Sequence, residues 1–206
     1  MNTTFYHMAR QTTFEKWREE VPRDFKYTLK LYRLFIHYKR LVLKKEEIKI
    51  LKAFIENGLL LKNKLGPILI QLPPSLKCNH AHLDKFLTQM EKIESRLKVR
   101  LKHAIEFRHE TWFNEQTYQL LKRHKAALVI TNSPHWPYSV IKTANFLYMR
   151  FHGRTKLFAS NYTKAELRVW AKTLKALKAK EVYAYFNNDA NAYAADNALY
   201  LKQRFD

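Results

Sequence analysis

Apolar and polar positions along this chain follow a repeating order. Short apolar runs of strand length, each ending in polar or charged residues, recur at residues 24–30, 67–72, 103–108, 127–133, 146–152 and 181–187. Such runs predict strands whose polar tips all come at the carboxyl end. In a β/α barrel the functional side chains sit at those carboxyl ends, so the pattern indicates both the fold and the face to search.

Longer segments between these runs predict helices. Apolar residues recur at three- and four-residue steps in 48–59 and in 80–97, so each segment has one buried face. A helix is predicted from about 112 to 125, and another opens at the capping-box pattern that begins at Thr163. The last helix is predicted from about Asp189 to near the carboxyl end. The result is six strand–helix units after a short starting segment.

Alternation within one run favours a closed barrel over an open, doubly wound sheet. In residues 146–153, the side chains of Tyr148, Arg150 and His152 share one face, while the opposite face is apolar. A strand buried in an open parallel sheet is more often apolar on both faces. We therefore predict an α/β protein with a single TIM-type β/α-barrel domain over residues 1–206.

The amino-acid composition argues against several kinds of site and several classes of protein. Only three glycines are present, too few for a glycine-rich phosphate loop. The single cysteine, Cys78, excludes a disulfide framework and a cysteine metal cluster. No apolar run reaches the ~20 residues of a membrane span, and the amino end lacks the layout of a signal peptide. We expect a cytoplasmic protein with no membrane partner.

The formal net charge of +20 attracts nucleic acid, anionic lipid or anionic metabolites. Lysines in residues 44–64 are interleaved with glutamates, which is typical of a solvated helix surface. The aromatic and basic segment 32–38 has the composition of a base-stacking surface, although the same residues suit a cover over one end of the barrel. The loop at 133–138 suits either a lid or simple packing.

Five segments carry a family resemblance. Residues 2–6, 65–75, 106–113, 146–154 and 182–189 read NTTFY, LGPILIQLPPS, EFRHETWF, FLYMRFHGR and VYAYFNND. Together, and in this order, they resemble the YecE-like family, called domain of unknown function 72, over nearly the whole chain. The resemblance implies a TIM-type barrel of unestablished activity. A relationship to sugar isomerases has been suggested for that family from its fold alone.

The chain departs from that family pattern in two places. Relatives usually begin with a strand, a helix and a second strand before the segment that matches residues 2–6. We therefore expect a barrel that lacks the first strand, the first helix and most of the second strand, and is open between its second and last strands. Such a barrel exposes strand edges. Either the chain is a truncated reading frame or fragment, which we favour, or something fills the gap. The second departure is Ile36-His37, where relatives carry threonine and histidine.

Glu106 and Arg108 lie two residues apart on one predicted strand, so their side chains point to the same face. Glu106 is a candidate general acid or base, and Arg108 is a candidate clamp for a carboxylate or phosphate. His109 and Trp112, in the loop that follows, are further ligand-binding candidates. The alternative is that Glu106 and Arg108 form a structural ion pair.

Arg150, His152 and Arg154 repeat this pattern on a later strand, and Gly153 allows the backbone to approach a ligand. Both arginines are predicted to bind an anion, since guanidinium binds carboxylate and phosphate through paired hydrogen bonds. His152 is a second catalytic candidate. The alternative is that Arg150 pairs with Glu106 and that Arg154 is solvated.

Asn187, Asn188 and Asp189 close the last strand and are predicted to bind ligand. Amides donate and accept hydrogen bonds at once, which suits the hydroxyl groups of a polyol or sugar. Asp189 is well placed to cap the final helix instead, so we favour Asn187 or Asn188 over Asp189 as residues that face the pocket.

Three candidates come from the first half of the chain. Lys30, at a strand tip, suits either a catalytic Schiff-base amine or a further anion contact, and we favour the anion contact. Gln71 and His37 are candidate polar lining of the pocket.

No metal and no cofactor are predicted. Glu106, His109, His152 and Asp189 could converge on a cation, but the neighbouring arginines would repel it.

These residues predict an enzyme-type pocket for a small anionic, hydroxylated ligand such as a sugar phosphate, with isomerase or lyase chemistry. Two alternatives stay open: a basic nucleic-acid-associated protein, and a truncated fragment without activity of its own. Salt separates the first two, because nucleic-acid affinity falls steeply with salt, whereas binding in a buried pocket depends on it less. The residues carry no signal for an oligomeric state.

Overall fold

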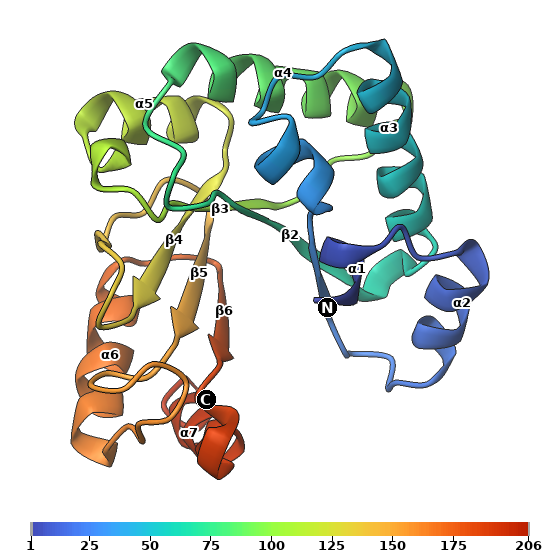
Figure 1. The fold of residues 1–206 in the computed structure, drawn as a ribbon. Helices are drawn as coiled ribbons and strands as arrows, with labels where there is room; N and C mark the ends of the chain where they lie inside the picture. Colours follow the sequence, from blue (N-terminus) through green and yellow to red (C-terminus); the bar gives the residue numbers. More distant parts are fainter. Residues whose placement is uncertain (1, 206) are drawn as a thin grey trace. The chain divides into compact units, whose positions relative to one another are not determined.

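The computed structural model describes residues 2–205. The chain divides into two compact units, Met1–Ile105 and Glu106–Asp206. Figure 1 labels their helices and strands. The helices and strands alternate along most of the chain, so the protein is of the α/β class. The single domain predicted over residues 1–206 stays a prediction.

The first unit pairs its first two strands in parallel. Its helices are α1 (Thr3–Tyr6), α2 (Gln11–Glu19), α3 (Lys45–Leu59) and α4 (His80–Arg96), and its strands are β1 (Tyr27–Lys30), β2 (Leu65–Gln71) and most of β3 (His103–Glu106). A π-helical turn covers Leu34–Tyr38, and a short 3-10 helix covers Lys62–Lys64. The register pairs Leu29 with Ile68 and Lys30 with Leu69. This arrangement sets the carboxyl ends of β1 and β2 side by side.

Helix α3 buries the apolar face that its sequence predicted. Its buried positions include Leu51, Phe54, Ile55 and Gly58, at the three- and four-residue steps seen in the sequence. A Cβ atom at Gly58 would lie 3.0 Å from the Leu29 side chain of β1. The glycine therefore lets the helix pack closely on the strand.

The second unit is built on three parallel strands. Strands β4 (Ala127–Asn132), β5 (Phe146–Phe151) and β6 (Glu181–Phe186) are accompanied by helices α5 (Glu115–Arg123), α6 (Lys164–Ala176) and α7 (Tyr193–Lys202). Short 3-10 helices cover Glu110–Trp112 and Asp189–Asn191. Strand β5 pairs in parallel with β4 on one side and with β6 on the other. In both units neighbouring strands follow one another in chain order, as in TIM-like folds. In a doubly wound sheet the order of the strands instead reverses at a switch point.

The two faces of β5 have different roles. Leu147, Met149 and Phe151 belong to an apolar cluster that includes Leu167 of α6 and Leu201 of α7. The intervening residues point to the opposite face because side chains alternate along a strand. Tyr148 and Arg150 therefore lie on that opposite face, as the alternation in the sequence predicted.

Several element boundaries differ from those expected. The reciprocal capping box of Thr163 and Glu166 does open α6, as predicted. The helix expected over 112–125 is instead a 3-10 turn followed by α5, because Asn114 caps the later start. Chain 133–145 joins β4 to β5 with no helix, so the count of six strand–helix units is wrong. Nothing in the apolar pattern had predicted α1, α2 or the π-helical turn.

Candidate functional site

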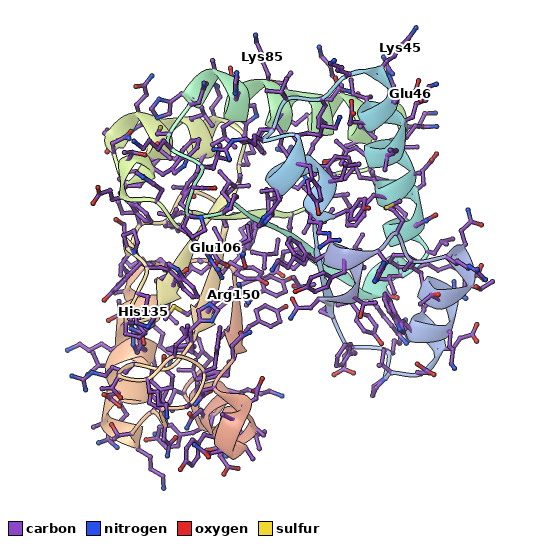
Figure 2. All side chains as sticks on the ribbon, in the orientation of Figure 1. Lys45, Glu46, Lys85, Glu106, His135 and Arg150 are labelled. Atoms are coloured by element: carbon purple, nitrogen blue, oxygen red, sulfur yellow. The ribbon has the colours of Figure 1, made fainter. Side chains whose placement is uncertain are left out.

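An ion cluster of three side chains lies on the polar face of the second unit. Glu106, at the end of β3, is fully buried. Its Oε2 atom accepts a hydrogen bond from Arg150 Nη1 at 2.5 Å, and its Oε1 atom accepts one from Arg108 Nε at 2.9 Å. Figure 2 shows the side chains of Glu106 and Arg150 next to each other. Each carboxylate oxygen therefore holds a different arginine.

The strand register places Arg150 within a row of side chains. Arg150 of β5 is paired with Thr131 of β4 and with Tyr185 of β6, so the three side chains share one face of the sheet. Two residues before Arg150 on the same face, Tyr148 stacks on Tyr185 with 5.1 Å between the ring centroids. The Thr131 hydroxyl is buried and has no hydrogen-bond partner among the described residues. Thr131 and Tyr185 therefore flank Arg150 on the face of the sheet that carries the ion cluster.

Electrostatics keep Glu106 ionised. Burial by itself would raise the pKa of this carboxyl, but the charge and hydrogen bond of Arg150 and the charge of Arg108 outweigh burial and hold the pKa at about 2. Conversely, burial would lower the pKa of Arg150, and the charge of Glu106 raises it above its ordinary value. At neutral pH the cluster therefore carries two positive charges and one negative charge.

Aromatic rings hold Arg108 and His152 beside this cluster. The guanidinium of Arg108 lies 3.7 Å from the centroid of the Trp136 ring, which comes from the β4–β5 connection. The same ring meets His152 edge to face at 5.2 Å. His152 is 1% exposed, and Phe158 lies on it at 5.6 Å. Trp136 therefore packs against both a candidate anion clamp and a candidate catalytic residue, and a lid role for its loop stays a prediction.

The loop after β3 is anchored by stacking. Trp112 is fully buried and stacks on Phe107 with 4.6 Å between the ring centroids. His109 accepts a hydrogen bond from the Thr111 backbone N–H at 3.2 Å and so caps the short 3-10 turn. Both predicted ligand-binding residues thereby shape the loop that carries Arg108.

The loop after β5 needs its glycine. Gly153 has a φ of +91°, and a Cβ atom there would lie 2.4 Å from the Lys156 carbonyl oxygen. The Gly153 N–H donates to the Tyr162 hydroxyl at 3.0 Å, and that hydroxyl donates to Asn132 at 2.7 Å. Arg154, next along the chain, forms an ion pair with Glu166 and keeps 65% of its side chain exposed. Arg154 is thus paired at the surface, outside the Glu106 cluster.

The end of β6 carries a network of amides. Asn188 is buried and donates to the Ser160 carbonyl oxygen at 3.2 Å and to Asn197 Oδ1 at 2.9 Å. The Asn187 backbone N–H donates to the Phe151 carbonyl oxygen at 2.7 Å. Asp189 is exposed and begins a 3-10 turn, while α7 begins only at Tyr193. The alternative role of Asp189 as the cap of the final helix is therefore wrong, because a left-handed residue at Ala192 separates the two helical segments.

Three predicted residues belong to the first unit. Lys30 Nζ lies 4.0 Å from the centroid of the Phe5 ring, and His37 meets the same ring edge to face at 5.2 Å. Gln71 is buried at the end of β2. The structure thus brings Lys30 and His37 together around Phe5, and it gathers Glu106, Arg108, Arg150 and His152 as a separate group in the second unit.

Sequence reasoning missed Thr131 and Tyr185. Both lie beside Arg150 only because of the strand register, which no pattern within a single strand reveals. Among residues 2–205, no group of three or more His, Cys, Asp or Glu side chains is arranged to hold a metal ion. None of the described helices is long and apolar enough to cross a membrane.

Comparison with known proteins shows which family the chain matches. The chain matches the family described as protein of unknown function DUF72 over residues 1–206. It is 27% identical to the UPF0759 protein YunF of Bacillus subtilis (strain 168) over 240 residues, covering 100% of this chain and 82% of that protein.

Solved structures agree in fold. A DUF72 family protein from Thermotoga maritima MSB8 matches with a TM-score of 0.78 at 28% identity, covering 98% of this chain and 82% of that one. One from Enterococcus faecalis V583 matches with a TM-score of 0.81 at 24% identity, covering 99% and 82%. The resemblance read from the five sequence segments is confirmed, and the chain belongs to the DUF72 family.

Proposed function

We propose that this protein binds a small anionic, hydroxylated molecule, such as a sugar phosphate, at the Glu106–Arg108–Arg150 cluster and acts on it as an isomerase or lyase. The observation that carries the proposal is the charge of the cluster, where two guanidinium groups share one buried, ionised carboxylate. An anionic group placed beside the arginines would balance their second positive charge. Arginine is also the side chain best shaped to grip phosphate or carboxylate.

Exposure decides where that anion enters. The side chain of Arg108 is 16% exposed, whereas those of Arg150 and Glu106 are 7% and 0% exposed. Arg108 is therefore the member of the cluster that a ligand meets first, and its stacking on Trp136 holds its guanidinium in place. Arg150 is more deeply buried and is held by its ion pair with the same carboxylate.

Two groups are assigned to proton transfer, and for Glu106 that role depends on the bound ligand. With a pKa of about 2, Glu106 is ionised and is a poor proton donor at neutral pH. Its role without ligand is to position the two arginines. A bound anion that drew an arginine away would raise the pKa of Glu106 and make it a better base. His152, enclosed by Trp136 and Phe158, is the second group assigned to proton transfer.

Ligand-dependent thermal unfolding tests this function. The purified chain is screened against sugar phosphates, the matching neutral sugars, nucleotides and simple carboxylates. A ligand at a hundred times its Kd stabilises the native state by ~2.7 kcal/mol. We expect stabilisation by phosphorylated sugars and none by the neutral ones. The hits are then assayed for isomerisation and elimination products.

The matched variants are Arg108→Gln and Lys85→Gln. Each removes one positive charge, but Lys85 is an exposed residue of α4 in the first unit. Arg108→Gln should abolish the ligand shift, and Lys85→Gln should preserve it. If no anionic hydroxylated ligand stabilises the wild-type protein, or if both variants respond as the wild type does, the proposed function is rejected.

One observation favours nucleic-acid binding as a second candidate. Tyr6 and Tyr38 are 51% and 63% exposed, and the Arg33 guanidinium lies 5.6 and 5.7 Å from their ring centroids. Exposed aromatic rings around a guanidinium suit stacking with unpaired bases. Binding of a single-stranded oligonucleotide that weakens steeply with salt and is reduced by Tyr38→Ala would support this candidate. Binding that Tyr38→Ala leaves unchanged would assign it to net charge alone.

A further inference from the structure

We propose that a hollow on the apolar side of β6 binds a long-chain carboxylate, that is, the anion of a fatty acid. The hollow has a volume of about 670 Å³ and is bounded by the end of α6, by β6 and by α7. Figure 1 shows α7 beside the end of β6, and contacts join α7 to both β6 and α6. Its apolar walls are formed by Leu174, Val182, Ala184, Phe186, Leu201 and Phe205.

The hollow arises from small side chains at places where larger ones would close it. Ala179, Ala184 and Ala198 all line it. Along β6, Val182 and Ala184 face the hollow, and Tyr185, on the opposite face, stacks on Tyr148. The thickness of the sheet therefore separates the hollow from the Arg150 cluster, and the proposal is independent of the proposed function.

Charge selects the head group of the ligand. Lys175 of α6, Lys180 before β6 and Lys202 of α7 line the hollow, together with a single acidic residue, Glu181. All three lysines are exposed, so their ammonium groups sit at the water-facing rim. An apolar floor with a positive rim fits a molecule that has an apolar chain and one anionic end.

Size and charge favour this occupant over a second copy of the chain. The volume falls within the range of small-molecule sites, which are mostly apolar with a few polar groups that fix orientation. A second copy would bring another chain of net charge +20 against the lysine rim, which electrostatic repulsion opposes.

Calorimetric titration of the whole chain with dodecanoate, kept below its micelle concentration, tests the proposal. We expect one saturable site. Decanoate should bind ~15-fold more weakly, since each buried methylene contributes about fourfold in affinity and the two chains differ by two. Dodecyltrimethylammonium has the same chain length and a cationic head, and it should not bind measurably.

Two pairs of variants locate the site. Lys180→Glu should weaken dodecanoate binding about fivefold by reversing one rim charge, while Lys172→Glu, an exposed α6 position outside the hollow, should not. Ala198→Leu should weaken it by filling the hollow, while Ala195→Leu, exposed on α7, should not. Because Ala198 is half-buried, the exposed Lys180 carries the test if Ala198→Leu fails to fold.

Several results would overturn the proposal. One is an affinity that does not depend on chain length, and another is equal binding of the cationic amphiphile. Equal weakening by Lys172→Glu and Lys180→Glu would assign binding to net charge. A chain that self-associates and binds no carboxylate would show that a second copy fills the hollow.

Discussion

Replacing Glu106 with glutamine should destabilise the second unit strongly. Glutamine has nearly the same shape as glutamate but no charge, so Arg108 and Arg150 would lose the carboxylate that both of them contact. Glu106 is fully buried, and water does not replace its charge there. Removing one partner of a buried ion pair typically costs ~3–5 kcal/mol.

The pKa of Glu106 gives a separate magnitude. The folded-state pKa of about 2 lies below the ordinary value of 4.5. The difference corresponds to ~3 kcal/mol of folding free energy, at ~1.4 kcal/mol per pH unit. Because the folded pKa is depressed, this contribution is fully present above pH 4.5 and is lost as the pH falls toward 2. At pH 3 we expect ~1 kcal/mol of it to remain.

Urea denaturation followed by tryptophan fluorescence measures both effects. Three of the four tryptophans, Trp112, Trp136 and Trp170, lie in the second unit, so the signal reports mainly on that unit. The free energy of unfolding is measured for the wild type and Glu106→Gln at pH 7, 4.5 and 3. Other carboxyls with lowered pKa values are common to both proteins, so the difference between the proteins isolates Glu106.

Glu166→Gln is the matched control. Glu166 also pairs with an arginine, but the side chains of Glu166 and Arg154 are 22% and 65% exposed. Such a pair with an exposed partner contributes ~0–1 kcal/mol. Glutamine can still accept the capping hydrogen bond from the Thr163 N–H, so this variant should lose no more than ~1 kcal/mol. The reasoning about the buried cluster fails if Glu106→Gln loses less than ~1 kcal/mol at pH 7, or if its deficit does not shrink between pH 4.5 and pH 3.

Three further substitutions test single features by the same denaturation assay. Gly153→Ala should cost ~2 kcal/mol or more, because the left-handed backbone and the approach to Lys156 leave no room for Cβ; an unchanged stability would contradict this. Thr143→Val should cost ~1–3 kcal/mol, because the buried Thr143 hydroxyl bonds two backbone groups beside β4 at 2.7 Å each; Thr143→Ser should recover most of the loss. Glu94→Leu should cost ~1–3 kcal/mol, because it removes the acceptor that the Leu101 N–H meets at 3.0 Å and the carboxylate beside the buried His103 at 2.7 Å, and a neutral effect would contradict this.

Much of the fold was determined by the sequence alone. All six predicted strands formed, and their carboxyl ends fell within two residues of the expected ones, because short apolar runs bounded by polar residues are a local signal for strands. The capping box at Thr163 and Glu166 was read correctly because it needs only residues three positions apart. The alternation at 146–153 correctly separated the polar face of β5 from its apolar face.

Tertiary structure decided which of the candidate residues meet. Lys30 and Glu106 both end strands of the structure, yet Lys30 contacts Phe5 while Glu106 holds two arginines. The sequence left two interpretations of Arg150, an anion contact or a partner of Glu106. The folded structure pairs it with Glu106, 44 positions away along the chain. Arg154 followed the same local pattern as Arg150 but bonded Glu166 at the surface, because the turn at Gly153 redirects the chain.

The sequence by itself therefore determined the strands, the buried helix faces and the polar tips, since these follow from periodicity and from neighbours within one turn or one strand. Strand register, burial and the choice of ion partner depend on segments far apart along the chain. Those long-range choices placed Thr131 and Tyr185 beside Arg150, lowered the pKa of Glu106 and left the hollow beside β6. Only the packed structure could decide them, because each is a property of two or more elements and belongs to no single one of them.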